Sequence, residues 1–418
     1  MASKDKDIDV AVIGSGPAGL AAAIKAREAG AERVVVMERA EELGGLLHQC
    51  IHNGFGLLYF NEDLTGPEYA KRFTEKALDS GVEAQTETMV TGLSADREIR
   101  ATSTRQGHMI LNPKSIVLAM GCRERPRGSI GIPGTRPAGI FTAGTAQRFI
   151  NVEGFIPGER VVILGSGDIG MIMARRLTLE GARVEAVVEV LPYVGGLIRN
   201  EVQCVHDFDI PLFLEHTVTK VRGEERVDGV TISRIDKTWV PIPGTETNID
   251  CDTLLLSVGL IPENELSQMA GVRLDPITGG PFVDEYRQTN VPGIFAGGNV
   301  VQVHDLVDNV SWEAELAGEA AARFARAERM VEGQISFKPG RNIRYVAPQK
   351  ISGENDVTLY MRVREPGENV RIKVGDVASK KFMGVKPSEM IKLDISSDKL
   401  EKIKGGTSEI SVDCQGKE

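Results

Sequence analysis

Val10-Ala11-Val12-Ile13-Gly14-Ser15-Gly16-Pro17-Ala18-Gly19, near the start of the 418-residue chain, is an apolar run that leads directly into a glycine-rich turn. An alanine-rich segment to about residue 29 predicts a helix, and the apolar residues 34–37 predict a second strand. Strand, turn, helix and strand in this order form the βαβ unit of a parallel, dinucleotide-binding sheet.

The spacing of the three glycines gives each of them a role in this turn. Gly14 permits the tight bend, Gly16 lets a diphosphate approach bare backbone, and Gly19 lets helix and strand pack closely. The start of the helix offers backbone N–H groups and a positive dipole to the same diphosphate. Glu38 ends the second strand, where its carboxylate can accept hydrogen bonds from ribose hydroxyls.

The same unit occurs again about 150 residues further on. Residues 161–164 are apolar, Gly165-Ser166-Gly167-Asp168-Ile169-Gly170 repeats the turn, a helix through Leu177 follows, and Glu189 ends the next strand. Two such units predict two dinucleotide-binding domains. A carboxylate at residue 189 would repel a 2′-phosphate, which favours NADH over NADPH unless Arg175, Arg176 or Arg199 reaches the ribose.

The composition narrows the other possibilities. The formal net charge is −10 and no dense Lys/Arg run offsets it, so nucleic acid is not expected as a partner. No apolar stretch approaches the roughly 20 residues of a membrane span, and the five cysteines show no metal-ligand or disulfide spacing, so we expect a cytoplasmic protein without bound metal. Alternating apolar residues at 357–363 and 370–374 predict antiparallel strands in a small C-terminal domain.

Three further motifs complete a resemblance to a known group. Leu118-Ala119-Met120-Gly121, residues 257–264 and the block at residues 289–299 are similar to motifs of the pyridine nucleotide-disulfide oxidoreductase superfamily, over about residues 7–330. The resemblance implies FAD in the first domain and NAD(H) in the second. The implied FAD contacts are Gly14, Gly16, Pro17, Ala18, Gly19, Glu38, Arg39, Gly45, Gly121, Gly298 and Asn299. The implied NAD contacts are Gly165, Gly167, Asp168, Ile169, Gly170, Glu189 and Gly259.

We therefore expect an α/β fold with two Rossmann-like domains, the NAD domain inserted into the FAD domain, followed by a small β-rich domain. The expected boundaries are residues 1–125 and 263–330 for the FAD domain, 126–262 for the NAD domain and 331–418 for the C-terminal domain. Trp312 lies on a helix that should point its N-terminus at the flavin, and packing is the ordinary role for such a tryptophan.

The sequence departs from the resembled family at two places. Asn299 stands where the family has an aspartate that binds the flavin ribityl chain; an amide still forms hydrogen bonds but carries no charge. Leu47 and His52 occupy the two positions of the redox-active CxxxxC, and the second domain has no CxxC either. Electrons must then leave toward oxygen, a small acceptor or another protein.

Three residues beside the expected flavin site are candidate catalytic groups: His48, Cys50 and His52. Cys50 could be a thiolate nucleophile or a buried small apolar side chain, and the second role is the more common one. The two histidines could donate protons or form part of the pocket wall. Arg123 and Arg125 could position a nicotinamide phosphate or be solvated charges of the linker.

Residues 121–126 resemble a turn in flavoprotein subunits of multi-subunit amine and amino-acid dehydrogenases or oxidases. The run from Arg123 through residues 139–147, together with the β-rich tail, resembles NAD(FAD)-dependent dehydrogenases that accompany a glycerol-3-phosphate dehydrogenase-type flavoprotein. The resemblance implies an NADH-linked electron-transfer subunit, in a homo- or hetero-oligomer. The alternatives are a self-contained NADH oxidase or NADH:acceptor reductase, and a nucleotide-binding subunit without turnover.

Overall fold

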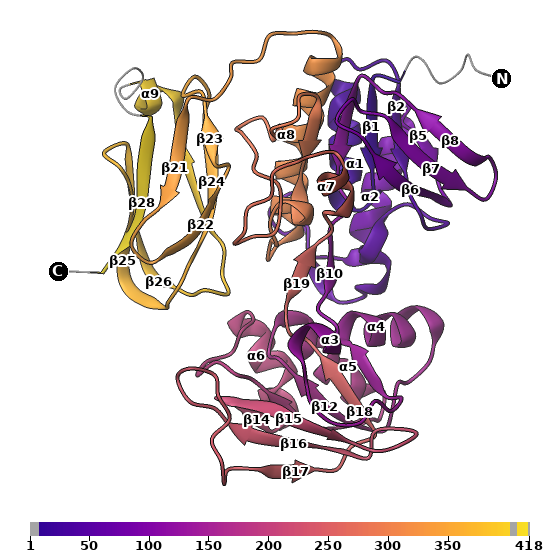
Figure 1. Cartoon of the computed structure of the whole chain (residues 1–418), viewed down its shortest axis with the longest axis vertical. Helices are drawn as coiled ribbons and strands as arrows, with labels where there is room; N and C mark the ends of the chain where they lie inside the picture. Colours follow the sequence, from indigo (N-terminus) through magenta and orange to yellow (C-terminus); the bar gives the residue numbers. More distant parts are fainter. Residues whose placement is uncertain (1–7, 402–407, 417–418) are drawn as a thin grey trace. The chain divides into compact units, whose positions relative to one another are not determined.

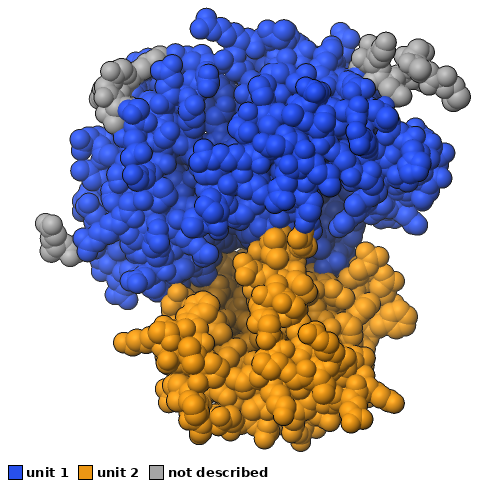
Figure 2. Space-filling view, in the orientation of Figure 1, with its two compact units in different colours: residues 1–122, 262–418 blue, residues 123–261 orange. Residues whose placement is uncertain are grey.

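The computed structural model describes residues 8–401 and 408–416. The chain forms two compact units, Met1–Cys122 with Pro262–Glu418 and Arg123–Ile261 (Figure 2). We call them unit 1 and unit 2. Their boundaries fall within a few residues of those expected for the inserted domain. The β-rich tail, predicted to be a separate domain, falls within unit 1 in this division into two units and has a hydrophobic core of its own.

Unit 1 is built on a five-stranded parallel sheet in the order β20-β9-β1-β2-β5; β1, β2 and β5 are labelled in Figure 1. Its strands are β20 (Ile294–Ala296), β9 (Ser115–Leu118), β1 (Val10–Ile13), β2 (Val34–Met37) and β5 (Glu83–Gln85). The two strands expected from the first motif are therefore confirmed. The chain enters β20 only after unit 2, so residues far apart in the sequence share one sheet.

Both faces of this sheet are covered, which explains the continuous apolar run of β1. Val10 and Val12 pack into a core with the helices, whereas Ala11 and Ile13 pack into a second core on the opposite face. The first face carries α1 (Pro17–Glu28), α2 (Gly66–Asp79) and α8 (Val307–Ala325); the second carries β6 (Thr88–Leu93), β7 (Ile99–Ser103) and β8 (Gly107–Leu111). Thr65 and Glu68 begin α2 with a capping box.

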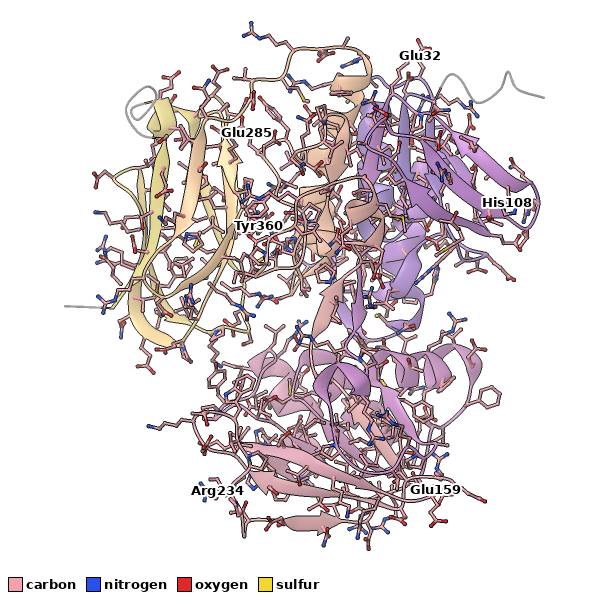
Figure 3. All side chains as sticks on the ribbon, in the orientation of Figure 1. Glu32, His108, Glu159, Arg234, Glu285 and Tyr360 are labelled. Carbon is pink, nitrogen blue, oxygen red and sulfur yellow. The ribbon has the colours of Figure 1, made fainter. Side chains whose placement is uncertain are left out.

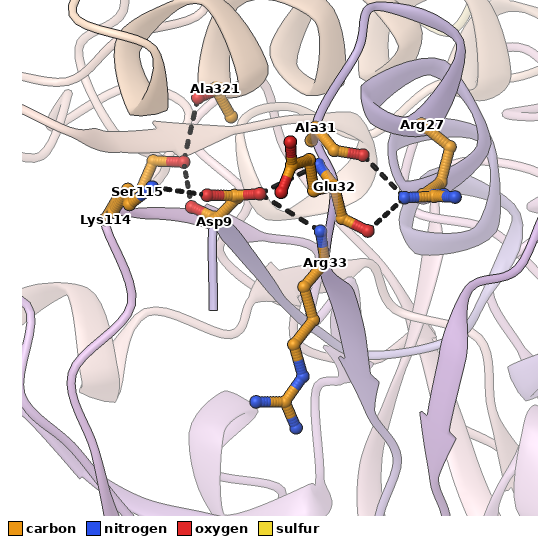
Figure 4. Close-up of polar contacts among 8 residues, drawn as sticks. All are labelled: Asp9, Arg27, Ala31, Glu32, Arg33, Lys114, Ser115 and Ala321. Atoms are coloured by element: carbon orange, nitrogen blue, oxygen red, sulfur yellow. Dashed lines mark hydrogen bonds and ion pairs between the residues drawn. The ribbon is translucent and has the colours of Figure 1, made fainter. Parts of the chain in front are cut away.

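The amino end of the sheet is fixed by a network around Asp9 and Ser115 (Figure 4). The Asp9 carboxylate accepts hydrogen bonds from the backbone of Glu32 and Arg33 and from Lys114 Nζ at 2.7 Å. The buried Ser115 hydroxyl lies 2.9 Å from the carbonyl of Ala321 on α8. These bonds tie strands and helix together at the edge opposite the glycine turn.

Unit 2 repeats this architecture. Its parallel sheet has the order β11-β18-β12-β13-β14, and the antiparallel strands β15 to β17 pack on it through the core that includes Val162 and Val218. The elements are β11 (Ile140–Thr142), α4 (Ala143–Arg148), η2 (Phe149–Glu153), β12 (Arg160–Leu164), α5 (Asp168–Leu179), β13 (Arg183–Val188), α6 (Ile198–Cys204), η3 (His206–Phe208), β14 (Leu212–Phe213), β15 (His216–Arg222), β16 (Gly229–Arg234), β17 (Thr247–Ile249) and β18 (Thr253–Leu256). The expected repeat of the βαβ unit is confirmed.

Short elements connect these sheets. The two crossings between the units are β10 (Cys122–Glu124) and β19 (Leu260–Pro262), which pair with each other. The others are η1 (Gly45–Gln49), β3 (Asn53–Phe55), β4 (Leu64–Thr65), α3 (Arg127–Ile130), α7 (Glu265–Met269) and η4 (Gly298–Val300). Among residues 8–401 and 408–416, no helix is both long enough and apolar enough to cross a bilayer.

The C-terminal part of unit 1 consists of two sheets around a core of its own, in the orders β23-β21-β28-β25-β26 and β22-β24-β27. The elements are β21 (Ile335–Pro339), β22 (Ile343–Ala347), β23 (Lys350–Ile351), β24 (Val357–Val363), β25 (Gly367–Val374), β26 (Ala378–Val385), β27 (Ile391–Ile395), α9 (Ser397–Leu400) and β28 (Glu409–Gln415). We call this part the β domain. The strands predicted at residues 357–363 and 370–374, now β24 and β25, make the expected antiparallel pairs. β21 and β28 pair in parallel, which the intervening strands permit because they provide the long crossover that parallel pairing needs.

Candidate cofactor-binding site

The first glycine turn joins β1 to α1 and leaves one side of its backbone open. Gly14 has φ +99°, and a Cβ there would lie 2.6 Å from the carbonyl oxygen of Ala119. A Cβ on Gly19 would lie only 1.8 Å from the carbonyl oxygen of Gly14. A Cβ on Gly16 would meet no atom within 4 Å. The fold itself therefore requires glycine at two of the three positions, whereas Gly16 faces free space.

The N-terminus of α1 opens onto that space. Gly16 is the N-cap residue, no side chain caps the helix, and no acidic residue lies in its first turn. Pro17 occupies the first turn, where its missing N–H costs no hydrogen bond. Ala18 is buried. The first-turn N–H groups and the helix dipole are thus available to an anion, as a diphosphate site requires.

Glu38 is buried at the end of β2 and is fixed by the glycine turn itself. One carboxylate oxygen accepts hydrogen bonds from the Ser15 backbone N–H at 2.9 Å and the Ser15 hydroxyl at 2.6 Å. The other accepts the N–H of Ala40 at 2.9 Å. A carboxylate has about four acceptor positions, so capacity remains for a ribose hydroxyl. Glu38 was predicted from the sequence as a ribose contact, whereas the role of Ser15 was not predicted.

The second glycine turn, in unit 2, repeats this arrangement atom for atom. Glu189 is buried and accepts the Ser166 N–H at 2.8 Å, the Ser166 hydroxyl at 2.7 Å and the Leu191 N–H at 2.9 Å. Gly165 has the same φ as Gly14, +99°. The serine that follows the first glycine of both turns was the sequence signal for this lock.

The side chain of Asp168 forms hydrogen bonds within the protein and leaves no donor for an anion. Its Oδ1 accepts hydrogen bonds from the Leu197 N–H at 2.8 Å and from Asn200 Nδ2 at 2.6 Å. It thereby holds the loop after β13 over the start of α5. Ile169 follows it in the first turn and packs partly against the core of this unit, and Gly170 N–H donates to Ser257 Oγ at 3.1 Å. Asn200 carried no recognisable motif.

A third group of predicted residues lies at the carboxyl ends of β9 and β20 in unit 1. Gly298 N–H donates to the buried Glu313 carboxylate at 3.0 Å. Asn299 Oδ1 accepts the His304 N–H at 3.0 Å, and its Nδ2 lies 3.7 Å from Cys122 Sγ. The amide at residue 299 is therefore held by both of its ends. Glu313 and His304 were not among the expected site residues.

The helix after this turn, α8, presents an N-terminus that no side chain caps. Asp308 in its first turn accepts the Tyr59 N–H at 2.8 Å. Trp312 is half-buried, with its ring 5.9 Å from that of Tyr59 and with Lys392 Nζ 4.5 Å from its centroid. The tryptophan packs between unit 1 elements, the ordinary role considered for it.

The three candidate catalytic residues lie on one segment, but the side chain of each lies against a backbone carbonyl of a residue one to five positions away. Cys50 is buried, its Sγ donates to the Leu46 carbonyl at 3.6 Å, and burial raises the pKa of the thiol to about 12. His48 Nε2 lies 2.6 Å from the Leu43 carbonyl oxygen, and His52 Nδ1 lies 2.9 Å from that of Asn53. A thiol that stays protonated at neutral pH argues against a thiolate nucleophile.

The remaining predicted contacts are loop positions. Arg39 is exposed, and Gly45 packs over the first turn, since a Cβ there would lie 2.9 Å from Gly16 Cα. A Cβ on Gly121 would meet no atom within 4 Å, and one on Gly259 would meet only Arg125. A Cβ on Gly167 would lie 3.3 Å from Ser257 Oγ.

These observations agree with two dinucleotides, one in each unit. Both turns offer a glycine backbone at a helix N-terminus and a locked carboxylate, which fit a diphosphate and a ribose; the backbone is fully open at Gly16, whereas in unit 2 Ser257 Oγ accepts the Gly170 N–H of the first turn of α5. Within the described part of the chain, no three His, Cys, Asp or Glu side chains are grouped as metal ligands, and none of the five cysteines forms a disulfide.

The chain is similar to known proteins in sequence and in fold. The sequence profile of the family described as "Pyridine nucleotide-disulphide oxidoreductase" matches residues 8–314. An opine oxidase subunit from Agrobacterium tumefaciens is 26% identical, over 78% of this chain and 67% of its own length. Hydrogen cyanide synthase subunit HcnB of Pseudomonas protegens is 26% identical, over 62% of this chain and 58% of its own length. The crystal structure of thioredoxin reductase from T. acidophilum superposes with a TM-score of 0.63 and 25% identity, over 76% of this chain and 98% of that one.

Proposed function

The chain belongs to the pyridine nucleotide-disulphide oxidoreductase family, whose members use FAD and NAD(P)H, and from this premise we propose that it is the NADH-linked, electron-transferring subunit of a dehydrogenase complex. Bound FAD would supply the centre that accepts and releases electrons.

One observation carries the proposal: both glycine turns and their locked carboxylates are complete, whereas the family's dithiol is missing. Leu47 and His52 stand at the two dithiol positions, and the pKa of the nearby Cys50 thiol is raised to about 12 by burial. Two complete cradles favour exchange of electrons between two dinucleotides. The lack of a dithiol directs those electrons to an acceptor outside the chain.

Glu189 supports the choice of NADH. Its carboxylate is fixed by three donors at the end of β13, where the adenosine ribose of a bound nucleotide belongs. A fixed carboxylate can accept a hydrogen bond from a 2′-hydroxyl and repels a 2′-phosphate. Arg176, one of the arginines that could have reversed this preference, is bound to Glu180 and Asn151.

The names of two relatives support a partner protein. The opine oxidase chain from Agrobacterium tumefaciens and the hydrogen cyanide synthase chain HcnB are both described as subunits. This chain spans 67% and 58% of their lengths, so the activity of those whole proteins is not transferred to it. We propose a companion that oxidises an amine, an amino acid or glycerol 3-phosphate, in the cytoplasm, where cysteines stay reduced.

Anaerobic titration of the purified, flavin-loaded protein with NADH tests the redox part. Stoichiometric bleaching of the flavin absorption by NADH, much faster than by NADPH, is the expected result. A protein that binds flavin but is not bleached by either nucleotide would be a nucleotide-binding subunit without turnover. Glu189→Gln serves as the matched variant, because it removes the charge and keeps the size; it should bring the two nucleotides closer in rate.

Affinity capture of the tagged chain from its own host tests the partner. Recovery of a second flavoprotein in a fixed ratio, and reduction of this chain's flavin by that protein's substrate without NADH, are the expected results. Capture of the chain alone, combined with rapid NADH-dependent oxygen consumption, would instead support a self-contained oxidase.

A further inference from the structure

The β domain presents two large side chains from the outer face of one strand. Along β24, Leu359, Met361 and Val363 point into the core of the β domain. Because side chains alternate along a strand, Tyr360 and Arg362 lie together on the opposite face. Tyr360 is nonetheless buried (labelled in Figure 3), so this face is covered by other parts of unit 1.

Arg362 clamps the loop that precedes α8. One guanidinium nitrogen donates to the Val303 carbonyl at 3.1 Å and also bonds the Asp305 carboxylate. The other oxygen of Asp305 accepts the N–H of Met390, which follows β26 in the β domain, at 2.6 Å. Both side chains of the ion pair are largely buried. A partly desolvated, charge-assisted arginine contact of this kind fixes position strongly.

Tyr360 covers the neighbouring residue of the same loop. The His304 ring stands edge-on to the Tyr360 ring at 5.1 Å and 87°. On its other side, His304 Nε2 lies 2.9 Å from the carboxylate of Glu313, which is fully buried on α8. Arg287 Nε lies 3.3 Å from the same carboxylate. Burial alone would raise the pKa of Glu313, but His304 and Arg287 hold it below its ordinary value.

The buried carboxylate then reaches the turn that carries Asn299. Glu313 accepts the Gly298 N–H at 3.0 Å and Gln302 Nε2 at 3.2 Å. The backbone N–H of His304 holds the Asn299 side chain at 3.0 Å. Contacts therefore run without interruption from two residues of β24, through residues 302–305, to both residues of the turn.

We propose that the β domain positions the flavin-binding turn: Tyr360 and Arg362 are positioning residues that fix Gly298 and Asn299 through His304, Asp305 and Glu313. The turn lost the family's aspartate, and with it a direct charge beside the flavin. The geometry of the turn is instead fixed by β24, a strand about 60 residues further along the chain. The inference requires only FAD binding, and neither the preference for NADH nor the partner.

Two substitutions at the clamp and one matched control test the inference. Arg362→Gln removes the guanidinium that bonds Val303 and Asp305, and Asp305→Asn removes the charge of its partner while keeping the acceptor for Met390. Arg364→Gln is the control, because Arg364 lies in the same segment and its guanidinium donates to the Ile343 carbonyl at 3.1 Å, within the β domain. The measurements are the FAD dissociation constant, the flavin midpoint potential and the visible spectrum.

Both clamp variants should bind FAD at least tenfold more weakly and show a shifted potential, whereas the control should match the parent protein. A tenfold unequal loss between oxidised and reduced flavin corresponds to about 30 mV for this two-electron couple. Arg362→Lys should recover part of the affinity. Parent-like affinity and potential in either folded clamp variant would overturn the inference, as would equal losses in the control. Should Arg362→Gln not fold, Asp305→Asn decides alone.

Discussion

Alanine in place of Gly16 should leave the fold intact and remove FAD binding. Gly16 has φ −66° and ψ −175°, which alanine adopts readily, and a Cβ there would meet no atom within 4 Å. The substitution should therefore leave stability unchanged or raise it by about 0.4–1 kcal/mol. Gly19→Ala is the contrast, because its Cβ would lie 1.8 Å from a backbone oxygen, and we expect that protein to unfold.

The loss of affinity follows from the position of the added methyl group. It stands where the diphosphate must approach the first N–H groups of α1, which no side chain caps. A hydrogen bond to a charged group contributes about 1.5–3 kcal/mol. Loss of two such bonds amounts to roughly 3–6 kcal/mol, or a factor of about 10² to 10⁴ in dissociation constant.

Gly167→Ala is the counterpart in unit 2 and makes the test specific. Its Cβ would lie 3.3 Å from the Ser257 hydroxyl, a contact that a small shift relieves. This variant should keep FAD and lose NADH affinity, whereas Gly16→Ala should lose FAD. Flavin fluorescence on titration measures the affinity for FAD, and anaerobic bleaching of the flavin measures the response to NADH. Thermal melting of the apoproteins measures their stability. Parent-like FAD affinity in Gly16→Ala, or loss of FAD in Gly167→Ala, would refute the assignment of the two turns.

Three further predictions concern single side chains. Cys50→Ser should leave flavin reduction by NADH within about twofold of the parent, because the thiol is buried and its pKa, raised to about 12, disfavours a thiolate nucleophile; loss of the reductive half-reaction measured by stopped flow would contradict this. Burial raises the pKa of Asp284 to about 6, above its value in the unfolded chain, so the parent loses stability as the pH rises through 6. Asp284→Asn should therefore gain about 1–2 kcal/mol relative to the parent between about pH 4.5 and about pH 7.5 in urea unfolding, and an equal difference at both pH values would exclude this titration. Ser115→Ala should cost about 1–2 kcal/mol, since the single O–H of this buried hydroxyl is shared between the Asp9 and Ala321 carbonyls, 3.1 and 2.9 Å from its oxygen; a melting temperature like that of the parent would show that these contacts contribute nothing.

Local sequence determined the parts of this protein whose physics is local. The apolar runs at residues 10–13 and 161–164 form strands that are buried on both faces, and the glycine turns that follow take their shape from residues adjacent in the chain. Glu38 directly follows β2 and Glu189 directly follows β13, the second strands of the two βαβ motifs, so a fixed spacing from the glycines was enough to locate them. The family, the fold class and both cofactors follow from these short segments and the three family motifs.

The tertiary structure decided what depends on residues far apart in the chain. Whether Cys50 is a thiolate or a buried thiol depends on desolvation, which no spacing reports. β21 pairs in parallel with β28, and Arg362 binds Asp305. Each contact joins two distant segments, and the sequence pattern of one segment does not predict its contact with the other. The alternation of apolar residues along β24 identified its core face, but the same alternation predicts that Tyr360 and Arg362 face solvent. Only the packing of that strand against the loop before α8 gives them partners, because burial of a side chain is a property of the whole fold.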